Sequence, residues 1–549
     1  MRRISKNDAE WLQKYFGERI AFDRVERMLY GHDIAAMPRL FKPLIGDTIP
    51  DAVVQPTSEK ELVELVQWAN RRRVALTPRV KASSGYGGVL PTRKGIVIDF
   101  YRMKELLSVD QKELTVTVQP GITWEQLDKK IDRYGLTLRL YPSSYPSSSA
   151  GGWLAQGGAG FGSYEFGWYS ENVVSVRVVQ PDGEVKVFSG EELELIADAE
   201  GITGIISEVT LKVQPKTELG VISVAFPNPR KFADAMKAIV NENLALWSIV
   251  FINPRMAELK NRAPMMTHFG HPVGHKPMLP AAYIATIAFR RSDEELVLPT
   301  LNQIVRNHEG DVLSQEIANH EWAERFKLMV VKRLGPSLVP AEVVVPLDNF
   351  DKVMTDIENK VDQPVVKEGV IIKKGKDGQP EVVILGFIPS DQRKFAYNLV
   401  FGLVLTILKI AEKNGGRAYS TGLYFSSRAS KILGKQRAKQ MKQYKKAIDP
   451  RNILNPDKVF GGKMISKILG MANLLEPVAR PFGNLVIMKV GEQPEQQPVK
   501  DIPGDVAWYA YACSQCGYCI DECDQFYGRG WESQSPRGKW YWLREYMEG

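Results

Sequence analysis

The chain has 549 residues, which is more than one hydrophobic core accommodates, and its 44% hydrophobic and 25% charged residues are typical of a globular protein. Its formal charge of +8 is uneven: residues 501–549 carry four Lys/Arg and eight Asp/Glu, or −4, which leaves 68 minus 56, or +12, on residues 1–500. The N-terminus lacks an apolar run of signal-peptide length, and the longest apolar stretch, residues 399–411, is shorter than the ~20 residues of a spanning helix. We therefore expect several domains, no Sec export and no membrane span.

The predicted elements begin with a helical lead-in over residues 1–45. Residues 51–80 then predict a strand, a helix and a second strand, because apolar residues recur at helical spacing in the middle of this stretch. Thr57 or Ser58 is expected to cap the helix.

From about residue 82 to 214, short β-type runs alternate with turns rich in Gly, Ser and Pro. The sequence QPDG at residues 180–183 is a hairpin signal between two of these runs. We expect residues 46–214 to form one domain.

Residues 215–460 mix strands such as AEVVVPL and EVVILGF with helices such as DNFDKVMTDIENKV, which predicts a second, α/β domain. It ends at residues 449–460, where two Pro-containing turns stop the helical pattern. A connecting helix and a polar, Pro-rich linker are expected over residues 461–505, before a small module at residues 506–549.

Residues 428–446 carry eight Lys/Arg and no acidic residue. We favour a solvated helix face; the alternative is a docking site for an acidic partner or anionic lipid. Because residues 461–486 are basic and apolar, peripheral membrane contact through residues 428–486 stays open beside simple helix packing. No nucleic-acid-binding module accompanies the basic segment, so no nucleic-acid partner is expected.

All four cysteines of the chain lie in one short window with the spacing C-x2-C-x2-C-x3-C: Cys513, Cys516, Cys519 and Cys523. Thiolates at this spacing on a Gly-containing loop can converge on the corners of an iron–sulfur cube. Zinc sites more often use two separated C-x2-C pairs, and this chain has no second pair. The window therefore predicts a [4Fe–4S] cluster.

The role of Cys523 has two interpretations. In two-cluster ferredoxins the last cysteine of such a run serves the other cluster, and residues 535–549 resemble the segment between the two cluster motifs of the iron–sulfur subunits of glycolate oxidase and heterodisulfide reductase. Either Cys523 completes a single cluster with the other three, which we favour, or a further ligand comes from outside this chain.

Three separated loops suit one long cofactor: residues 78–88, 142–160 and 200–209. Their small residues let backbone N–H groups approach a pyrophosphate, and their serines add donors. There is no G-x-x-x-x-G-K-[ST], and neither GYGG nor GGAGFG gives G-x-G-x-x-G, so neither a P-loop nor a Rossmann dinucleotide site is supported.

The order of several motifs then suggests a family. These motifs are DAVVQPTSEKELVELVQWA, IVIDFYRMKELLSVD, VQPGITWEQLDKKIDRYGL, PSSYPSSSAGG, EGITGIISEVTLKV and AIDPRNILNPDKVF. Together they resemble the PCMH-type FAD-binding domain of the vanillyl-alcohol oxidase superfamily, and within it the D-lactate dehydrogenase and glycolate oxidase flavoproteins, over about residues 46–460. The resemblance implies an α+β fold: a two-subdomain FAD-binding domain (46–214), an α/β cap or substrate domain (215–460), and a small helical ferredoxin-like module (506–549).

The resemblance also implies which residues contact FAD. The pyrophosphate is expected near Lys81, Ala82, Ser83, Ser84 and Gly85; the flavin and diphosphate near Pro142, Ser143, Ser144, Gly151, Gly152 and Gly158; and the adenine side and the ring near Gly204, Ile205 and Ile206. Relatives have a more Gly-rich first loop, so Lys81 is expected to offer phosphate a positive charge. No histidine occurs at residues 33–267, so a histidyl-linked flavin in this domain is not expected.

The substrate side departs from the family. The D-lactate and glycolate relatives carry two histidine-containing signatures, whereas the corresponding residues 385–398 and 418–427 contain no histidine. Oxidation of a hydroxy acid requires a base and a cation. The candidates for these catalytic roles are Tyr419, Tyr424, Arg333 and Lys332.

Two functions follow. The favoured one is a dehydrogenase that oxidises a hydroxy acid of the D-lactate or glycolate class at FAD and passes electrons through the cluster to a partner subunit or quinone. The alternative is an electron-transfer subunit of a heterodisulfide-reductase-like complex, with no substrate site of its own. Both predict a cytoplasmic protein, with attachment to the inner face of the membrane left open.

Overall fold

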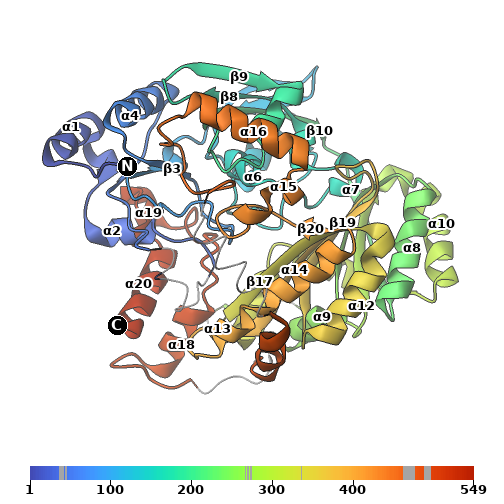
Figure 1. Ribbon diagram of the computed structural model, residues 1–549. Coiled ribbons are helices and arrows are strands. Elements are labelled where there is room, and N and C mark those ends of the chain that lie inside the picture. Colours follow the sequence, from blue (N-terminus) through green and yellow to red (C-terminus); the bar gives the residue numbers. More distant parts are fainter. Residues whose placement is uncertain are drawn as a thin grey trace.

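The structure is a computed structural model that describes residues 1–35, 43, 46–265, 267–268, 271–272, 275–335, 337–461, 476–487 and 496–549. Figure 1 shows an upper part built around two small sheets, a lower part built around one large sheet, and a C-terminal group of helices beside the N-terminal helices. Residues up to about 215 make the upper part and residues from about 219 to 418 the lower part, while α15 and α16, within residues 429–448, return to the upper part (Figure 1).

The first small sheet confirms the predicted strand–helix–strand unit. Its strands lie in the order β1 (Ile20–Ala21), β2 (Ala52–Val54), β4 (Ile96–Asp99) and β3 (Leu76–Arg79), with β2, β4 and β3 parallel. Helix α4 (Glu59–Arg72) connects β2 to β3, as parallel pairing requires. Of the two candidate caps, Ser58 is the N-cap, and its side chain accepts a hydrogen bond from the Glu61 N–H.

The second small sheet is antiparallel. Its strands are β5 (Leu106–Asp110), β6 (Thr115–Val118), β10 (Ile205–Pro215), β8 (Val173–Val179) and β9 (Val185–Ser189), with β7 (Leu136–Leu138) also paired to β10. The QPDG turn joins β8 and β9 as a hairpin, which was predicted. Of the loops that the sequence assigns to a cofactor, residues 142–160 lie between β7 and β8, residues 200–209 run into β10, and residues 78–88 begin at the end of β3 of the first sheet.

The large sheet forms the cap region. Its described strands, in spatial order, are β16 (Asp311–Val312), β11 (Leu219–Phe226), β15 (Tyr283–Arg290), β12 (Leu246–Ile252), β18 (Val365–Ile372), β19 (Glu381–Ser390), β17 (Ser337–Pro346) and β20 (Arg417–Ala418). Every strand pair in it is antiparallel.

Both faces of the cap sheet are covered, which explains why β19 is buried at every position. One face packs against α8 (Pro229–Asn241), α10 (Glu294–Asn307), α12 (Phe350–Lys360) and α14 (Leu403–Lys413). The apolar stretch at 399–411 is therefore largely the buried helix α14 (Figure 1). The other face shares an apolar core with the FAD-type region, where Trp247 and Val344 pack with Trp124 and Phe161.

The C-terminal module is helical, as predicted. It consists of α18 (Gly504–Ala512), α19 (Asp524–Arg529) and α20 (Pro536–Glu548), and the cysteines lie between α18 and α19. The module packs beside α2 (Arg24–Leu29), so the two ends of the chain meet (Figure 1).

The basic segment forms α15 (Ala429–Ile432) and α16 (Lys435–Ile448). Four of its eight cations are neutralised within the chain: Arg428 and Lys431 by Glu412, Arg437 by Asp198, and Lys445 by Asp449. Much of the predicted connecting segment, residues 462–475 and 488–495, lies outside the described residues. Among the described residues, no helix has the length and apolar character that crossing a membrane requires.

Candidate cofactor and electron-transfer site

A cavity of about 170 Å³ lies where the predicted cofactor loops meet the cap sheet; we call it the flavin-side cavity. Nine of the predicted FAD residues line it: Lys81, Ala82, Ser83, Ser84, Gly85, Pro142, Ser143, Ser144 and Gly152. Gly151 and Gly158 are chain neighbours of lining residues, whereas Gly204, Ile205 and Ile206 are not among the lining residues. The structure thus brings together the first two loops around one space.

The residues around this cavity fit a polar ligand. The side-chain atoms Ser148 Oγ, Gln156 Nε2 and Glu200 Oε1 are buried without a hydrogen-bond partner in the described part of the chain, and buried polar groups normally have partners. Burial raises the pKa of Glu200 to about 8, so this carboxyl can donate a hydrogen bond near neutral pH. A Cβ at Gly88 would lie 2.1 Å from Glu200 Oε2, so only glycine fits there.

Lys81 differs from the expectation. Its Nζ lies 2.9 Å from Asp521 Oδ1, and the side chain is 5% exposed, so its charge is matched by the cysteine module. The ammonium also lies near the rings of Tyr101 and Phe526. Lys81 therefore connects the first loop to the module, which the sequence pattern did not indicate.

The cap sheet supplies the opposite wall of the cavity. Glu342 on β17 and Lys367 on β18 line it, with their charged atoms 3.4 Å apart. Lys367 is the extra residue of a β-bulge, because Val366 pairs with Gly386 while Glu368 pairs with Leu385. The bulge breaks the alternation of β18, and it places the Lys367 cation beside Glu342 on this wall.

Burial perturbs the carboxyls of this wall. It raises the pKa of Glu342 above its ordinary value, although Lys367 acts in the opposite direction. Burial also raises the pKa of Glu368, which lies on β18 and lines a separate small cavity, to about 7. Both carboxyls are therefore weaker acids than exposed glutamates, which is the direction in which burial tunes a general base.

The predicted catalytic residues separate in the structure. Tyr419 lines the flavin-side cavity, and the Ala159 N–H donates to its hydroxyl at 3.1 Å. Tyr424 lines a neighbouring cavity. Arg333 is half-buried and is not among the residues that line either cavity. Lys332 is not among the residues that line either of these cavities, and its Nζ donates to the Cys513 carbonyl at 3.0 Å.

The sequence analysis missed Glu342 and Lys367 as site residues. A signal was present, because charges stand inside the apolar runs AEVVVPL and VVKEGVII, where buried strands rarely place them. The bulge that directs Lys367 had no local signal.

The cysteine loop folds around two left-handed residues, Gln515 (φ 58°) and Gly517 (φ 84°). All four cysteines are free thiols and half-buried. Burial raises the pKa of Cys519 to about 11, and the thiols of Cys516 and Cys513 lie close enough to add to this shift. The sulfur of Cys523 lies 3.9 Å from the Gln534 carbonyl oxygen.

Among the described residues, no three His, Cys, Asp or Glu side chains converge closely enough to hold a metal ion as they stand. The donor set nevertheless fits an iron–sulfur cluster, because four thiols are what one [4Fe–4S] cube takes. Buried cations flank the loop: Lys332 donates to the Cys513 carbonyl, and a Cβ at Gly517 would meet Arg537 Nη1 at 2.8 Å. Such charges offset the negative charge of thiolate-bound iron.

The cysteine loop also touches the cofactor loops directly. The Tyr518 hydroxyl donates to the Ser143 carbonyl at 2.9 Å. Arg537 Nη1 donates to the Lys81 carbonyl at 2.6 Å. A residue between two predicted cluster ligands therefore contacts a residue of the predicted flavin loop.

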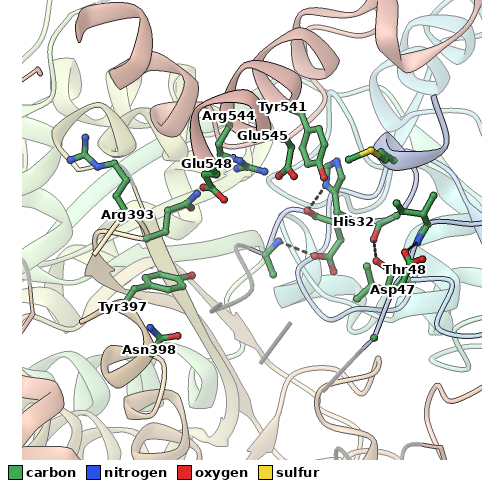
Figure 2. A pocket seen from close by; sticks show the side chains of 18 of the residues that line it. His32, Asp47, Thr48, Arg393, Tyr397, Asn398, Tyr541, Arg544, Glu545 and Glu548 are labelled. Carbon is green, nitrogen blue, oxygen red and sulfur yellow. Dashed lines mark hydrogen bonds between the residues drawn. The ribbon is translucent and has the colours of Figure 1, made fainter. Parts of the chain in front are cut away.

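A larger cavity of about 590 Å³ lies between the N-terminal segment, the cap region and α20; we call it the outer cavity. Figure 2 shows Arg544, Glu545 and Glu548 of α20 on one side, Arg393 and Tyr397 on another, and His32 with Thr48 on a third. His32 stacks on Tyr541 of α20 at 4.0 Å, which closes the wall between the N-terminus and the module.

Comparison with known families agrees with this division. Residues 50–189 match the family described as "FAD binding domain", residues 217–459 match "FAD linked oxidases, C-terminal domain", and residues 512–549 match "4Fe-4S dicluster domain". The three matches follow one another in the order that the sequence predicts.

Two curated relatives are similar to this chain over most of its length. The chain is 29% identical over 431 residues to the mitochondrial D-lactate dehydrogenase [cytochrome] of Arabidopsis thaliana, covering 75% of this chain and 74% of the relative. It is 26% identical over 482 residues to glycolate oxidase subunit GlcD of Bacillus subtilis (strain 168), covering 83% and 97%.

Solved structures share the fold. A structure of p-cresol methylhydroxylase with substrate bound has a TM-score of 0.69 at 14% identity, covering 83% of this chain and 98% of that one. A structure of alkyldihydroxyacetonephosphate synthase has a TM-score of 0.65 at 20% identity, covering 82% and 84%. The predicted α+β architecture with an FAD-binding domain, a cap and an iron–sulfur module is confirmed, and the chain is a PCMH-type flavoprotein, an FAD-dependent oxidoreductase that carries FAD and a C-terminal [4Fe–4S] module.

Proposed function

We propose that this protein oxidises a small hydroxy acid at FAD and passes the electrons through its own [4Fe–4S] cluster to a redox partner. The observation that carries this proposal is the 2.9 Å hydrogen bond from Tyr518 of the cysteine loop to Ser143 of the flavin-side cavity. It supports electron transfer within one chain, because the two cofactor regions share a wall.

The flavin-side cavity has the groups that a hydroxy acid requires. Lys367 is the cation for the substrate carboxylate, and Glu342 accepts the hydroxyl proton, since burial brings its pKa closer to neutral. The Tyr419 hydroxyl, which the Ala159 N–H holds in place, orients the substrate. Bound FAD accepts two electrons from an organic donor and releases them one at a time.

The cap wall also supports the donor class. D-lactate dehydrogenase and glycolate oxidase are named for small 2-hydroxy acids, and a cation paired with a carboxyl at 3.4 Å suits a molecule that carries both a carboxylate and a hydroxyl. The predicted FAD contacts of the first two loops are part of this proposal. Lys81 contacts FAD through its backbone in this proposal, because its side chain pairs with Asp521.

The alternative is an electron-transfer subunit without a substrate site. One observation favours it: none of the described residues lining the flavin-side cavity is a histidine, in line with the absence of histidine from residues 385–398 and 418–427. In that case FAD exchanges electrons with a partner protein.

Anaerobic titration separates the two functions. The oxidised protein is mixed with D-lactate, glycolate and L-lactate while the flavin absorbance and the cluster's electron paramagnetic resonance signal are recorded. Bleaching by one acid, followed by reduction of the cluster, supports the dehydrogenase. If none of the three acids bleaches the flavin of a protein that dithionite does reduce, the electron-transfer subunit is supported.

A matched pair of variants tests the assigned base. Glu342→Gln should lose donor-dependent bleaching while it keeps FAD. Glu324→Gln is the control, because Glu324 pairs with Lys327 on the surface and not with the cavity. Equal bleaching in both variants would remove Glu342 from the reaction.

The redox partner has two candidate contact regions. The module carries the net negative charge of residues 501–549, and α16 exposes cations such as Lys439 and Lys442, which form no ion pair with any residue that the structure describes. We propose that the module faces the electron acceptor, and that α16 provides any contact with an acidic partner or anionic lipid.

A further inference from the structure

Three cavities adjoin one another between the surface and the cap wall. A middle cavity of about 70 Å³ separates the outer cavity from the flavin-side cavity. Ala35 and Gln392 line both the outer and the middle cavity. Gly85, Glu342 and Lys367 line both the middle and the flavin-side cavity. Each cavity therefore meets the next at shared side chains.

Cations line every stage of this series; Arg393 and Lys394 also line the outer cavity, and Lys81 also lines the flavin-side cavity. Arg544 lines the outer cavity, Lys332 the middle cavity, and Lys367 both the middle and the flavin-side cavity. Arg544 lies over the Tyr541 ring at 5.2 Å and has no ion pair among the described residues (Figure 2). The spacing of these charges suggests a path for an anion.

Acidic residues also line the outer cavity, and several of them are already matched. Asp47 pairs with Lys94 at 2.5 Å. Asp33 is buried and accepts hydrogen bonds from the Gly87 and Ala35 N–H groups. Glu545 and Glu548 stand beside Arg544 on α20, and Arg393 and Lys394 also line the outer cavity, so the mouth carries charges of both signs.

Lys332 is the central residue of the series. It is 9% exposed, and its hydrogen bond to the Cys513 carbonyl at 3.0 Å uses one of its three donors. Among the described residues it forms no ion pair: Cys513, Arg544 and Cys516 are the charged or titratable groups that act on its pKa, while Glu342 and Lys367 line the same middle cavity. A buried ammonium that has unused hydrogen-bond donors and lies beside a cavity favours the binding of an anion there.

We propose that these cavities form one substrate passage, entered beside α20 and leading past Lys332 to Lys367, and that it admits small carboxylates. The passage rests on the proposed function for its cargo, but its geometry does not depend on which acid is oxidised. The iron–sulfur module then has a second role, because Arg544 and Ser514 belong to the walls of the passage.

A steric block tests the route. Gln392→Trp fills the junction of the outer and middle cavities, and the probe is sulfite, a small anion that bleaches oxidised flavin by adding to its ring. Gln392→Trp should bleach much more slowly than wild type, with FAD content, iron content and melting temperature unchanged. Gln440→Trp, at an exposed position of α16, is the matched control and should bleach at the wild-type rate.

A charge change tests the same route without adding bulk. Lys332→Met should slow bleaching by about tenfold and weaken its dependence on ionic strength, whereas Lys332→Arg should keep most of both. Iron content is measured in each variant, because Lys332 also touches the cysteine loop.

The outcomes are separable. Wild-type rates in both Gln392→Trp and Lys332→Met, or a wild-type protein that sulfite does not bleach, would overturn the passage. Slow bleaching in these variants, in a protein that no hydroxy acid reduces, would keep the passage and overturn the proposed donor.

Discussion

The FAD-binding region has two interfaces of opposite character. Against the cap it shares one continuous apolar core, in which Trp247 and Val383 of the cap pack with Trp124 and Phe161. Against the iron–sulfur module it uses ion pairs and hydrogen bonds to backbone carbonyls, with only small apolar clusters around Tyr541 and Phe526. Apolar burial is strong but not directional, whereas charged hydrogen bonds fix geometry.

The difference shows what each interface contributes. The cap interface is part of what folds the chain, so its loss should unfold the protein. The module interface holds the cysteine loop at a defined place against the flavin loops, so its loss should disturb electron transfer before it disturbs folding. Each prediction below tests one side of this contrast.

The largest effect is expected for the cluster ligands. Cys516→Ser should remove nearly all iron and sulfide, because a [4Fe–4S] cube loses a required thiolate, while FAD content and the fold remain. Ser514→Ala in the same loop is the control and should keep iron. A Cys516→Ser protein with full iron would refute the assignment.

The same assay settles the role of Cys523. If all four thiols hold one cluster, Cys523→Ser should lower iron as much as Cys516→Ser does. If Cys523 serves another role, as its place beside the Gln534 carbonyl allows, iron should stay near four per chain.

A large stability effect is expected at the cap interface. Trp247 is 3% exposed, and its indole N–H donates to the Arg139 carbonyl at 2.8 Å. Trp247→Ala should lower the free energy of unfolding by about 3–5 kcal/mol, since it leaves a cavity in the shared core. Chemical denaturation measures this loss, which should be accompanied by loss of FAD.

Tyr541→Ala is the matching change at the module interface. It removes the ring that stacks on His32, so the module should become more sensitive to protease while the main unfolding transition and FAD content change little. Global unfolding at this position would contradict the contrast between the two interfaces.

A moderate, pH-dependent effect is expected at Glu26. Burial raises its pKa to about 7, and its carboxylate accepts from the Ser533 N–H of the module. Because the folded-state pKa lies above the ordinary 4.5, the folded protein binds the extra proton, and stability falls as pH rises from about 4.5 to about 7, by about 3 kcal/mol in total.

The measurement is protease protection of the module at pH 5 and at pH 8. Wild type should be better protected at pH 5, and Glu26→Gln should show little difference between the two. Glu18→Gln, on the exposed N-terminal surface, should behave as wild type.

The smallest effect is expected for Tyr518→Phe. It removes the hydrogen bond to the Ser143 carbonyl, which contributes about 1 kcal/mol. Iron and FAD content should stay constant, while rapid-mixing measurements should show slower reduction of the cluster by the flavin. An unchanged rate would mean that this contact does not set the geometry of transfer.

Local patterns in the sequence predicted much of this molecule. Cysteine spacing predicted the cluster module, and small residues in two loops predicted the walls of the flavin-side cavity. Alternation and turn residues predicted the strand–helix–strand unit and the hairpin at QPDG. In each case the residues of one motif lie close together in the chain, so the local pattern carries the information.

The remaining features depend on distant residues. Lys81 meets Asp521 across 440 positions, and Lys332 meets Cys513 across 181 positions. The bulge at Lys367 arises from the register of β18 against β19, which no single strand encodes. Sequence analysis therefore predicted the loops around the flavin-side cavity, but not the distant residues that hold these loops in place.

The bond between Arg537 and the Lys81 carbonyl has a consequence for how the protein is made. During synthesis the loop that contains Lys81 leaves the ribosome hundreds of residues before Arg537. The nascent FAD-binding region therefore lacks this hydrogen bond at first. We expect FAD binding to be completed only after residue 537 has been synthesised.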